Sequence, residues 1–182
     1  MNRRWWAAEG GGAFTGRTLL NSSPIHVSQV DHVSDAFLSY SSIPGWISAG
    51  RGQQFVDLMR DAWRTRAYGD FWSYMLVAEG AVDIAAEPEL KVWDMAALDI
   101  VVREAGGTFT SLAGKAGPWG DNALATNTRL HDAAMAYVGH FPDTEPPERS
   151  WHGEPEPSES KETLNSNVHN FEFTREPSDE VP

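Results

Sequence analysis

The stretch WDMAALDIVVREAGG, residues 93–107, has the most regular pattern in this chain of 182 residues. Its apolar positions recur at i, i+3, i+4 and i+7, the spacing of one face of an α-helix. These positions are Leu98, Val101, Val102 and Ala105. An aspartate at the head and two glycines at the end supply start and stop signals. The pattern therefore predicts a helix that begins at Asp94 and ends before Gly106.

Outward from this helix, strand-like and helix-like segments alternate through residues 1–140, which favours a layered α/β fold. We expect helices over residues 53–63, 71–79 and 128–137. We expect strands over residues 26–30, 36–40, 65–68, 81–86, 108–110 and 123–126.

Two of the expected helices carry predictions about burial. Over residues 53–63 the apolar face comprises Phe55, Val56, Met59, Ala62 and Trp63. Over residues 71–79 the side chains expected to be largely buried are Phe71, Trp72, Met75, Leu76 and Ala78.

The N-terminal segment reads as two strands joined by a turn, with Gly10, Gly11 and Gly12 between Trp5–Ala8 and Ala13–Phe14. A triple glycine can cradle a phosphate. However, this one lacks the Gly-Lys-Ser/Thr ending of a P-loop, and no helix pattern follows it. A hairpin turn is the favoured interpretation.

Composition excludes several classes of protein. A net charge of -12 argues against a nucleic-acid-binding surface, which needs clustered Lys and Arg. No apolar run approaches the ~20 residues of a membrane span and no signal peptide is recognisable, so we expect no membrane partner and a cytoplasmic location. The chain has no cysteine, so a metal would be held by oxygen or imidazole ligands, which favours a hard cation.

Most of the acidity belongs to residues 141–182, which carry eleven Asp/Glu against three Lys/Arg. This segment is rich in Pro, Glu and Ser and has few apolar residues to offset the entropy of ordering it. We predict a disordered acidic tail that follows a domain of residues 1–140.

Asp94 has two interpretations that the spacing alone leaves open. An aspartate at a helix start caps a free backbone N–H and complements the helix dipole. The whole stretch of residues 93–107, however, resembles the C-terminal signature of the inositol monophosphatase family. In that family the aspartate of the Trp-Asp pair binds a catalytic magnesium (Mg2+) and contacts the substrate. The resemblance therefore implies that Asp94 is a metal ligand and a catalytic residue, a role compatible with capping.

Upstream, Arg66-Ala67-Tyr68-Gly69-Asp70 resembles the histidinol-phosphate phosphatase branch of this family, for which the Gly-Asp pair is a marker. The resemblance implies that Gly69 and Asp70 contact the substrate. An acidic Asp70 suits a substrate that carries an ammonium and an imidazole. Helix capping is the alternative role for Asp70.

Two further residues are candidate substrate contacts by the same resemblance. Glu87, seven residues before Asp94, matches a family position where an acid contacts a substrate hydroxyl or amine. It ends a predicted strand before Pro88, which places it at a sheet edge. Arg66 is a candidate for holding the phosphate. A solvated loop acid and an ordinary surface arginine are the respective alternatives.

The resemblance covers residues 1 to about 138 and corresponds to the C-terminal half of the family's layered αβαβα catalytic domain. The family's other metal ligands, an upstream Glu and an Asp-Pro-(Ile/Leu)-Asp-Gly-Thr motif, do not occur in this chain. We therefore expect a phosphatase fragment that is inactive alone, with histidinol phosphate as the favoured small phosphorylated substrate. An inositol or sugar phosphate, or a non-catalytic remnant of the fold, are the alternatives.

A half-domain would also expose surface that the family buries between its layers. The partners that such a surface allows are a second copy of the chain, forming a homodimer, and the missing N-terminal half.

Overall fold

The computed structural model describes residues 3–139, so the tail predicted for residues 141–182 lies outside the described residues. The described part is a mixed α/β fold, as the alternating sequence pattern predicts. Its strands are β1 (Arg4–Ala8), β2 (Gly12–Thr18), β3 (Asn21–Ile25), β4 (Phe37–Ser39), β5 (Arg64–Arg66), β6 (Ile84–Glu87), β7 (Thr108–Thr110) and β8 (Ala123–Thr126). Its α-helices are α1 (Ile43–Ser48), α2 (Gly52–Asp61), α3 (Asp70–Ala78), α4 (Val92–Glu104) and α5 (His131–Val138), and a 3-10 turn spans Val33–Asp35.

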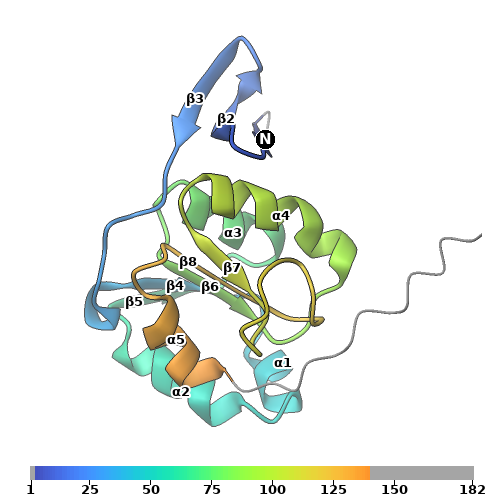
Figure 1. The fold of residues 1–182 in the computed structure, drawn as a ribbon. Coiled ribbons are helices and arrows are strands. Elements are labelled where there is room, and N and C mark those ends of the chain that lie inside the picture. The colour runs from blue at the N-terminus through green and yellow to red at the C-terminus, as the bar shows by residue number, and fades with distance from the viewer. Residues whose placement is uncertain (1–2, 140–182) are drawn as a thin grey trace, which may run out of the picture. The chain divides into compact units, whose positions relative to one another are not determined.

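The strands form two separate sheets (Figure 1). The smaller sheet is an antiparallel meander in the order β1-β2-β3. The larger sheet has the order β5-β4-β6-β8-β7. Within it, β4 runs parallel to β5 and β6, whereas β8 runs antiparallel to β6 and β7. Strand β6 is therefore the central strand.

Helices α3 and α4 lie between the two sheets, and α1, α2 and α5 cover the opposite face of the larger sheet (Figure 1). Each side has its own apolar core. Ala85 of β6 belongs to the core under α3 and α4, whereas its neighbours Ile84 and Ala86 belong to the core under α2 and α5. This alternation is the two-residue period of a strand covered on both faces. The result is a layered arrangement of sheet, helices, sheet and helices.

Helix α4 confirms the pattern of residues 93–107, because its four predicted core positions, Leu98, Val101, Val102 and Ala105, are all buried. The predicted start was wrong by two residues, since the helix begins at Val92. Asp94 lies in the first turn and its Oδ2 accepts a hydrogen bond from the Lys91 backbone N–H at 3.0 Å. A carboxylate three residues into a helix can reach back to the residue that precedes it, so Asp94 does not mark the start.

The triple glycine forms the predicted hairpin turn between β1 and β2. The backbone N–H groups of Gly10 and Gly12 donate to the two carboxylate oxygens of Glu104, each at 2.9 Å. These hydrogen bonds lower the pKa of Glu104. The turn therefore binds an anionic group, but that group belongs to helix α4 of the same chain.

The strand predicted over residues 26–30 was wrong. The third strand is β3 at Asn21–Ile25, where pairing with β2 aligns Ala13 with Ile25. The antiparallel ladder decides the strand's position here, although β3 is mostly exposed and lacks an apolar alternation. Beyond it, the Val27 backbone N–H donates to the Ala105 carbonyl at 3.0 Å and ties the chain to the end of α4.

Some side chains of the predicted apolar face of α2, and some of those predicted to be buried in α3, are exposed. In α2 the buried residues are Phe55 and Leu58, whereas Val56 is 43% exposed and Trp63, which follows the helix, is 61% exposed. In α3, Phe71 is 54% exposed and lies edge-on to Trp5 of β1.

Trp72 of α3 is 36% exposed, whereas Met75 and Ala78 of the same helix are buried as predicted. Helix α3 is apolar on most sides, so spacing alone does not identify its buried face. The pattern also missed α1, which Ser42 caps and in which Pro44 occupies the first turn. No helix of residues 3–139 is long and apolar enough to span a bilayer.

Candidate functional site

Glu87 is the last residue of the central strand β6, so it lies at the end of the sheet's middle strand and not on an edge strand. Its side chain is only 4% exposed. The Ser41 hydroxyl donates to Glu87 Oε1 at 2.5 Å. Burial raises the pKa of Glu87 to about 7, the nearby charge of Asp70 adds to this, and hydrogen bonds from Ser41 oppose it. Glu87 is therefore a buried carboxyl poised to exchange a proton near neutral pH.

Asp70 is the first residue of α3, and its side chain is exposed. The preceding Gly69 has φ 76° and ψ 166°, a backbone conformation that a side chain would disfavour. Asp70 itself has a positive φ of 47°. Its backbone N–H donates to Ser41 Oγ at 3.2 Å. The Gly-Asp pair thus forms a strained turn attached to Ser41.

Ser41 is therefore the residue that joins three of the predicted substrate contacts, Gly69, Asp70 and Glu87. A Cβ placed on Gly69 would lie 3.5 Å from Ser41 Oγ, which shows how closely the turn approaches the serine. Sequence reasoning missed Ser41. Its partners are 29 and 46 residues away along the chain, and no motif in the Ser39–Ser42 segment indicates them.

Tyr74 of α3 is a second residue that sequence reasoning missed. Burial, and the charge of Glu87, raise its pKa well above the ordinary value. The Tyr74 hydroxyl is buried and has no hydrogen-bond partner among residues 3–139. Glu87 is thus close enough to act on a buried tyrosine whose hydroxyl has no partner among the described residues.

Asp94 lies in the first turn of α4 with its side chain exposed. Its carboxylate accepts a hydrogen bond from the Lys91 backbone N–H, so Asp94 does cap the helix start. It does so from the first turn, because Lys91 occupies the N-cap position. Hydrogen bonds link Glu87 to Asp70 through Ser41, whereas that of Asp94 stays within its own helix start.

Arg66 ends the edge strand β5 and is exposed. Its guanidinium Nη1 donates to the neighbouring Thr65 carbonyl at 2.7 Å. This geometry matches the ordinary surface arginine that was the alternative to a phosphate contact. The hydrogen bond of Arg66 is thus with its own strand and not with Ser41.

A magnesium ion needs several oxygen ligands around one point. Within residues 3–139 no group of three or more His, Asp or Glu side chains is arranged to hold a metal ion. Asp94 by itself would supply a single carboxylate ligand. The described residues do not by themselves form a magnesium site.

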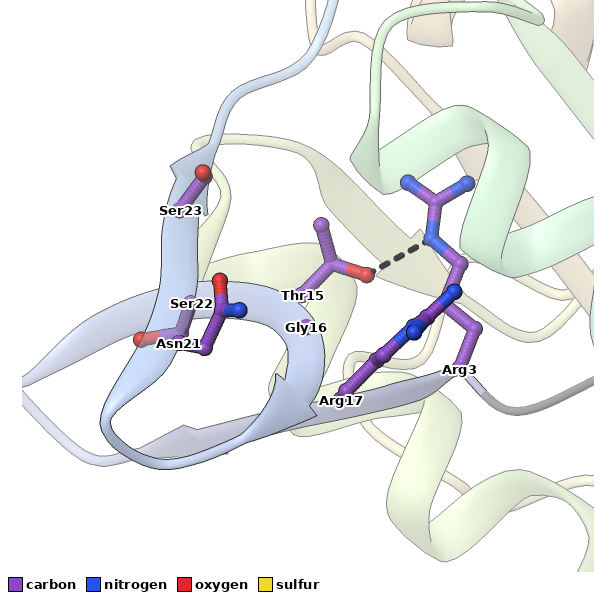
Figure 2. A pocket seen from close by; sticks show the side chains of 7 residues that line it. All are labelled: Arg3, Thr15, Gly16, Arg17, Asn21, Ser22 and Ser23. Atoms are coloured by element: carbon purple, nitrogen blue, oxygen red, sulfur yellow. Dashed lines mark hydrogen bonds between the residues drawn. The ribbon is translucent and has the colours of Figure 1, made fainter.

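A cavity of about 450 Å³ opens on the smaller sheet (Figure 2). Its lining residues are Arg3, Thr15, Gly16, Arg17, Asn21, Ser22 and Ser23. Arg3 Nε donates to Thr15 Oγ1 at 2.9 Å, and the guanidinium also pairs with Glu79 at 2.6 Å. None of the residues predicted to bind substrate lines this cavity, so it is separate from the group around Ser41.

Residues 1–141 match the model of the inositol monophosphatase family, and the chain belongs to this family. The Thermotoga maritima IMPase structure superimposes with a TM-score of 0.65 at 28% identity, over 75% of this chain and 51% of that one.

More specifically, the chain is similar to histidinol-phosphatases. It is 59% identical to that of Streptomyces coelicolor over 138 residues, which cover 76% of this chain and 52% of the relative. It is 56% identical to that of Mycobacterium tuberculosis over 135 residues, with 74% and 52% covered. The chain thus spans about half the length of the curated relatives it matches.

Proposed function

We propose that this chain provides the substrate-binding part of a magnesium-dependent phosphatase that hydrolyses histidinol phosphate. The observation that carries the proposal is the link between Asp70 and Glu87 through one serine hydroxyl. Two acids at one place suit a substrate with a cationic amine and an imidazole. The 59% identity to a histidinol-phosphatase supports this choice of substrate.

In this proposal, Asp70 and Glu87 bind the cationic end of the substrate, and Gly69 lets the backbone approach it. Asp94 is proposed as one magnesium ligand, because its side chain is exposed at a helix start. Magnesium would offset the repulsion between the negatively charged phosphate and the surrounding carboxylates. Arg66 is retained as a weaker candidate for the phosphate, since its present hydrogen bond to Thr65 is with its own strand.

We further propose that residues 1–140 form the C-terminal portion of the family's catalytic domain and that the remaining ligands come from a second segment. The relatives are about twice as long as the part that this chain matches, which supports a partner of that kind.

A second candidate function is hydrolysis of an inositol or sugar phosphate. One relative, 30% identical over 143 residues, is the fructose-1,6-bisphosphatase/inositol-1-monophosphatase of Thermotoga maritima. A further alternative is a non-catalytic remnant that keeps the fold. Asp70 favours histidinol phosphate over an inositol phosphate or a sugar phosphate, since a neutral polyol offers no cation to pair with its carboxylate.

The proposal can be tested by measuring phosphate release from histidinol phosphate, inositol monophosphate and fructose 1,6-bisphosphate with magnesium. The purified chain alone should show negligible turnover. The chain mixed or co-expressed with the part of the Streptomyces coelicolor relative that it does not cover should release phosphate from histidinol phosphate in preference to the others. Robust turnover by the chain alone, or none by the folded mixture, contradicts the proposal.

In the active mixture, Asp94→Asn should abolish turnover. Asp70→Asn should raise KM about tenfold with little change in kcat, because it removes a charge-assisted hydrogen bond to the substrate. Glu89→Gln is the matched control, since Glu89 is an exposed acid in the loop between Glu87 and Asp94. Unchanged kinetics in Asp70→Asn would remove the main support for histidinol phosphate.

A further inference from the structure

Ser41 lies in the bend between β4 and α1, outside every segment that the sequence pattern marks for function. One hydroxyl can donate one hydrogen bond and accept two. That of Ser41 donates to the Glu87 carboxylate and accepts from the Asp70 backbone N–H. It thereby joins the ends of three elements: β4, β6 and α3.

We infer that Ser41 is a positioning residue that orients the Glu87 carboxylate and holds the Gly69–Asp70 turn in the conformation that presents Asp70. The role of Ser41 in recognising the cationic end of the substrate rests on the proposed function. The positioning itself rests on the hydrogen bonds alone.

Each side of this arrangement needs the serine for a separate physical reason. A buried carboxyl is stabilised in its charged form by a hydrogen-bond donor, and Ser41 supplies that donor to Glu87. The turn has positive φ angles at both Gly69 and Asp70, which are held only where surrounding contacts fix them. Its hydrogen bond to Ser41 Oγ is such a contact.

The groups that act on Glu87 are few, which makes its titration a direct report on Ser41. Asp70 acts on Glu87 from α3, Ser41 acts from the bend after β4, and the charge of Glu87 acts in turn on the buried Tyr74 of α3. Burial and the charge of Asp70 raise the pKa of Glu87, whereas the Ser41 hydroxyl and backbone lower it. Loss of the hydroxyl alone should therefore shift the pKa upward from about 7.

The test is a pH titration of the Glu87 side-chain carboxyl carbon by NMR in the 182-residue chain, with the signal assigned by its loss in Glu87→Gln. Ser41→Ala should raise the pKa of Glu87, and the Asp70 amide should exchange its hydrogen faster. Ser41→Thr, which keeps the hydroxyl, should restore both values. Ser42→Ala is the matched control, because the Ser42 hydroxyl accepts from the Gly45 backbone N–H within α1 and makes no hydrogen bond to Glu87 or Asp70 among residues 3–139.

Should Ser41→Ala fail to fold, Ser41→Cys keeps the side-chain size and offers a weaker donor, so a smaller upward shift is expected. An unchanged pKa of Glu87 in a folded Ser41 variant, or an equal shift in Ser42→Ala, overturns the inference. Neither readout depends on phosphate release. The inference therefore fails or stands separately from the proposed function, which the turnover assays test.

Discussion

The two sheets of this chain differ in how they are covered. The larger sheet is packed on both faces, and every residue of β6 and β8 is buried. The smaller sheet packs against α4 through Ala13 and Ile25, whereas four of the five residues of β3 are exposed. The first sheet is held by burial of apolar surface. The second is attached through α4, through the contact of Trp5 with Phe71 of α3, and through a few polar contacts.

This difference also separates two carboxyl groups. Glu87, at the end of the larger sheet, is buried and has a raised pKa. Glu104, which holds the turn of the smaller sheet, lies at the surface and has a lowered pKa. Burial dominates in one case and hydrogen bonding by the backbone in the other.

Truncating a phenylalanine in the helix-covered core of the larger sheet and one in the smaller sheet should have the largest and most unequal effects. Phe55 is fully buried and stacks on Trp46 with ring centroids 4.3 Å apart. We expect Phe55→Ala to lower the free energy of unfolding by about 4 kcal/mol. Phe14 of β2 is half-buried and stacks on Trp6 at 6.4 Å, so Phe14→Ala should lower it by about 1 kcal/mol. Urea unfolding measures both, and equal losses would refute the contrast between the sheets.

The second largest expected effect is on how the free energy of unfolding depends on pH, through the buried Glu87 of the larger sheet. The pKa of Glu87 rises from 4.5 in the unfolded chain to about 7 in the folded one, so the folded state retains a proton that the unfolded state releases. Its contribution to stability is present below pH 4.5 and is lost as the pH rises toward 7. Glu87→Gln should remove this loss, up to about 3 kcal/mol at pH 7.5 relative to pH 4.5. Urea unfolding at both pH values tests it, and parallel pH profiles for variant and wild type would contradict it.

Glu104→Gln should have the smallest effect, confined to the smaller sheet. The variant weakens the acceptors for Gly10 and Gly12, so the amides of these residues should exchange hydrogen faster while those of β6 do not change. Because the pKa of Glu104 is lowered, its contribution is present above the unfolded pKa and is lost as the pH falls. Glu89→Gln is the control, and faster exchange in both variants would argue against the specific contact.

Regular periodicity allowed much of the fold to be predicted from the sequence. The core positions of α4 and the β1–β2 turn follow from spacing and glycine placement. The strand β3 could not be predicted, since it is mostly exposed and is positioned by pairing with β2. The exposed Phe71 could not be predicted either, because α3 is apolar on most sides.

The candidate site was predictable only where a local motif exists. Residues 69–70 and Glu87 were found by resemblance, and the structure links them. Ser41 has no local signal, because what gives it a role is two distant partners brought together by the fold. The roles of Asp94 and Arg66 stay predictions, since the described contacts of each are with adjacent backbone.

The strand order of the larger sheet also determines how much of the chain must be synthesised before the sheet can be completed. Strand β6 gains β4 as a neighbour early, but its other neighbour, β8, ends only at Thr126. Until that residue is synthesised, the nascent chain carries an apolar central strand with one open side. An unpaired edge of this kind favours pairing with other chains, so aggregation is the expected hazard until β8 is in place.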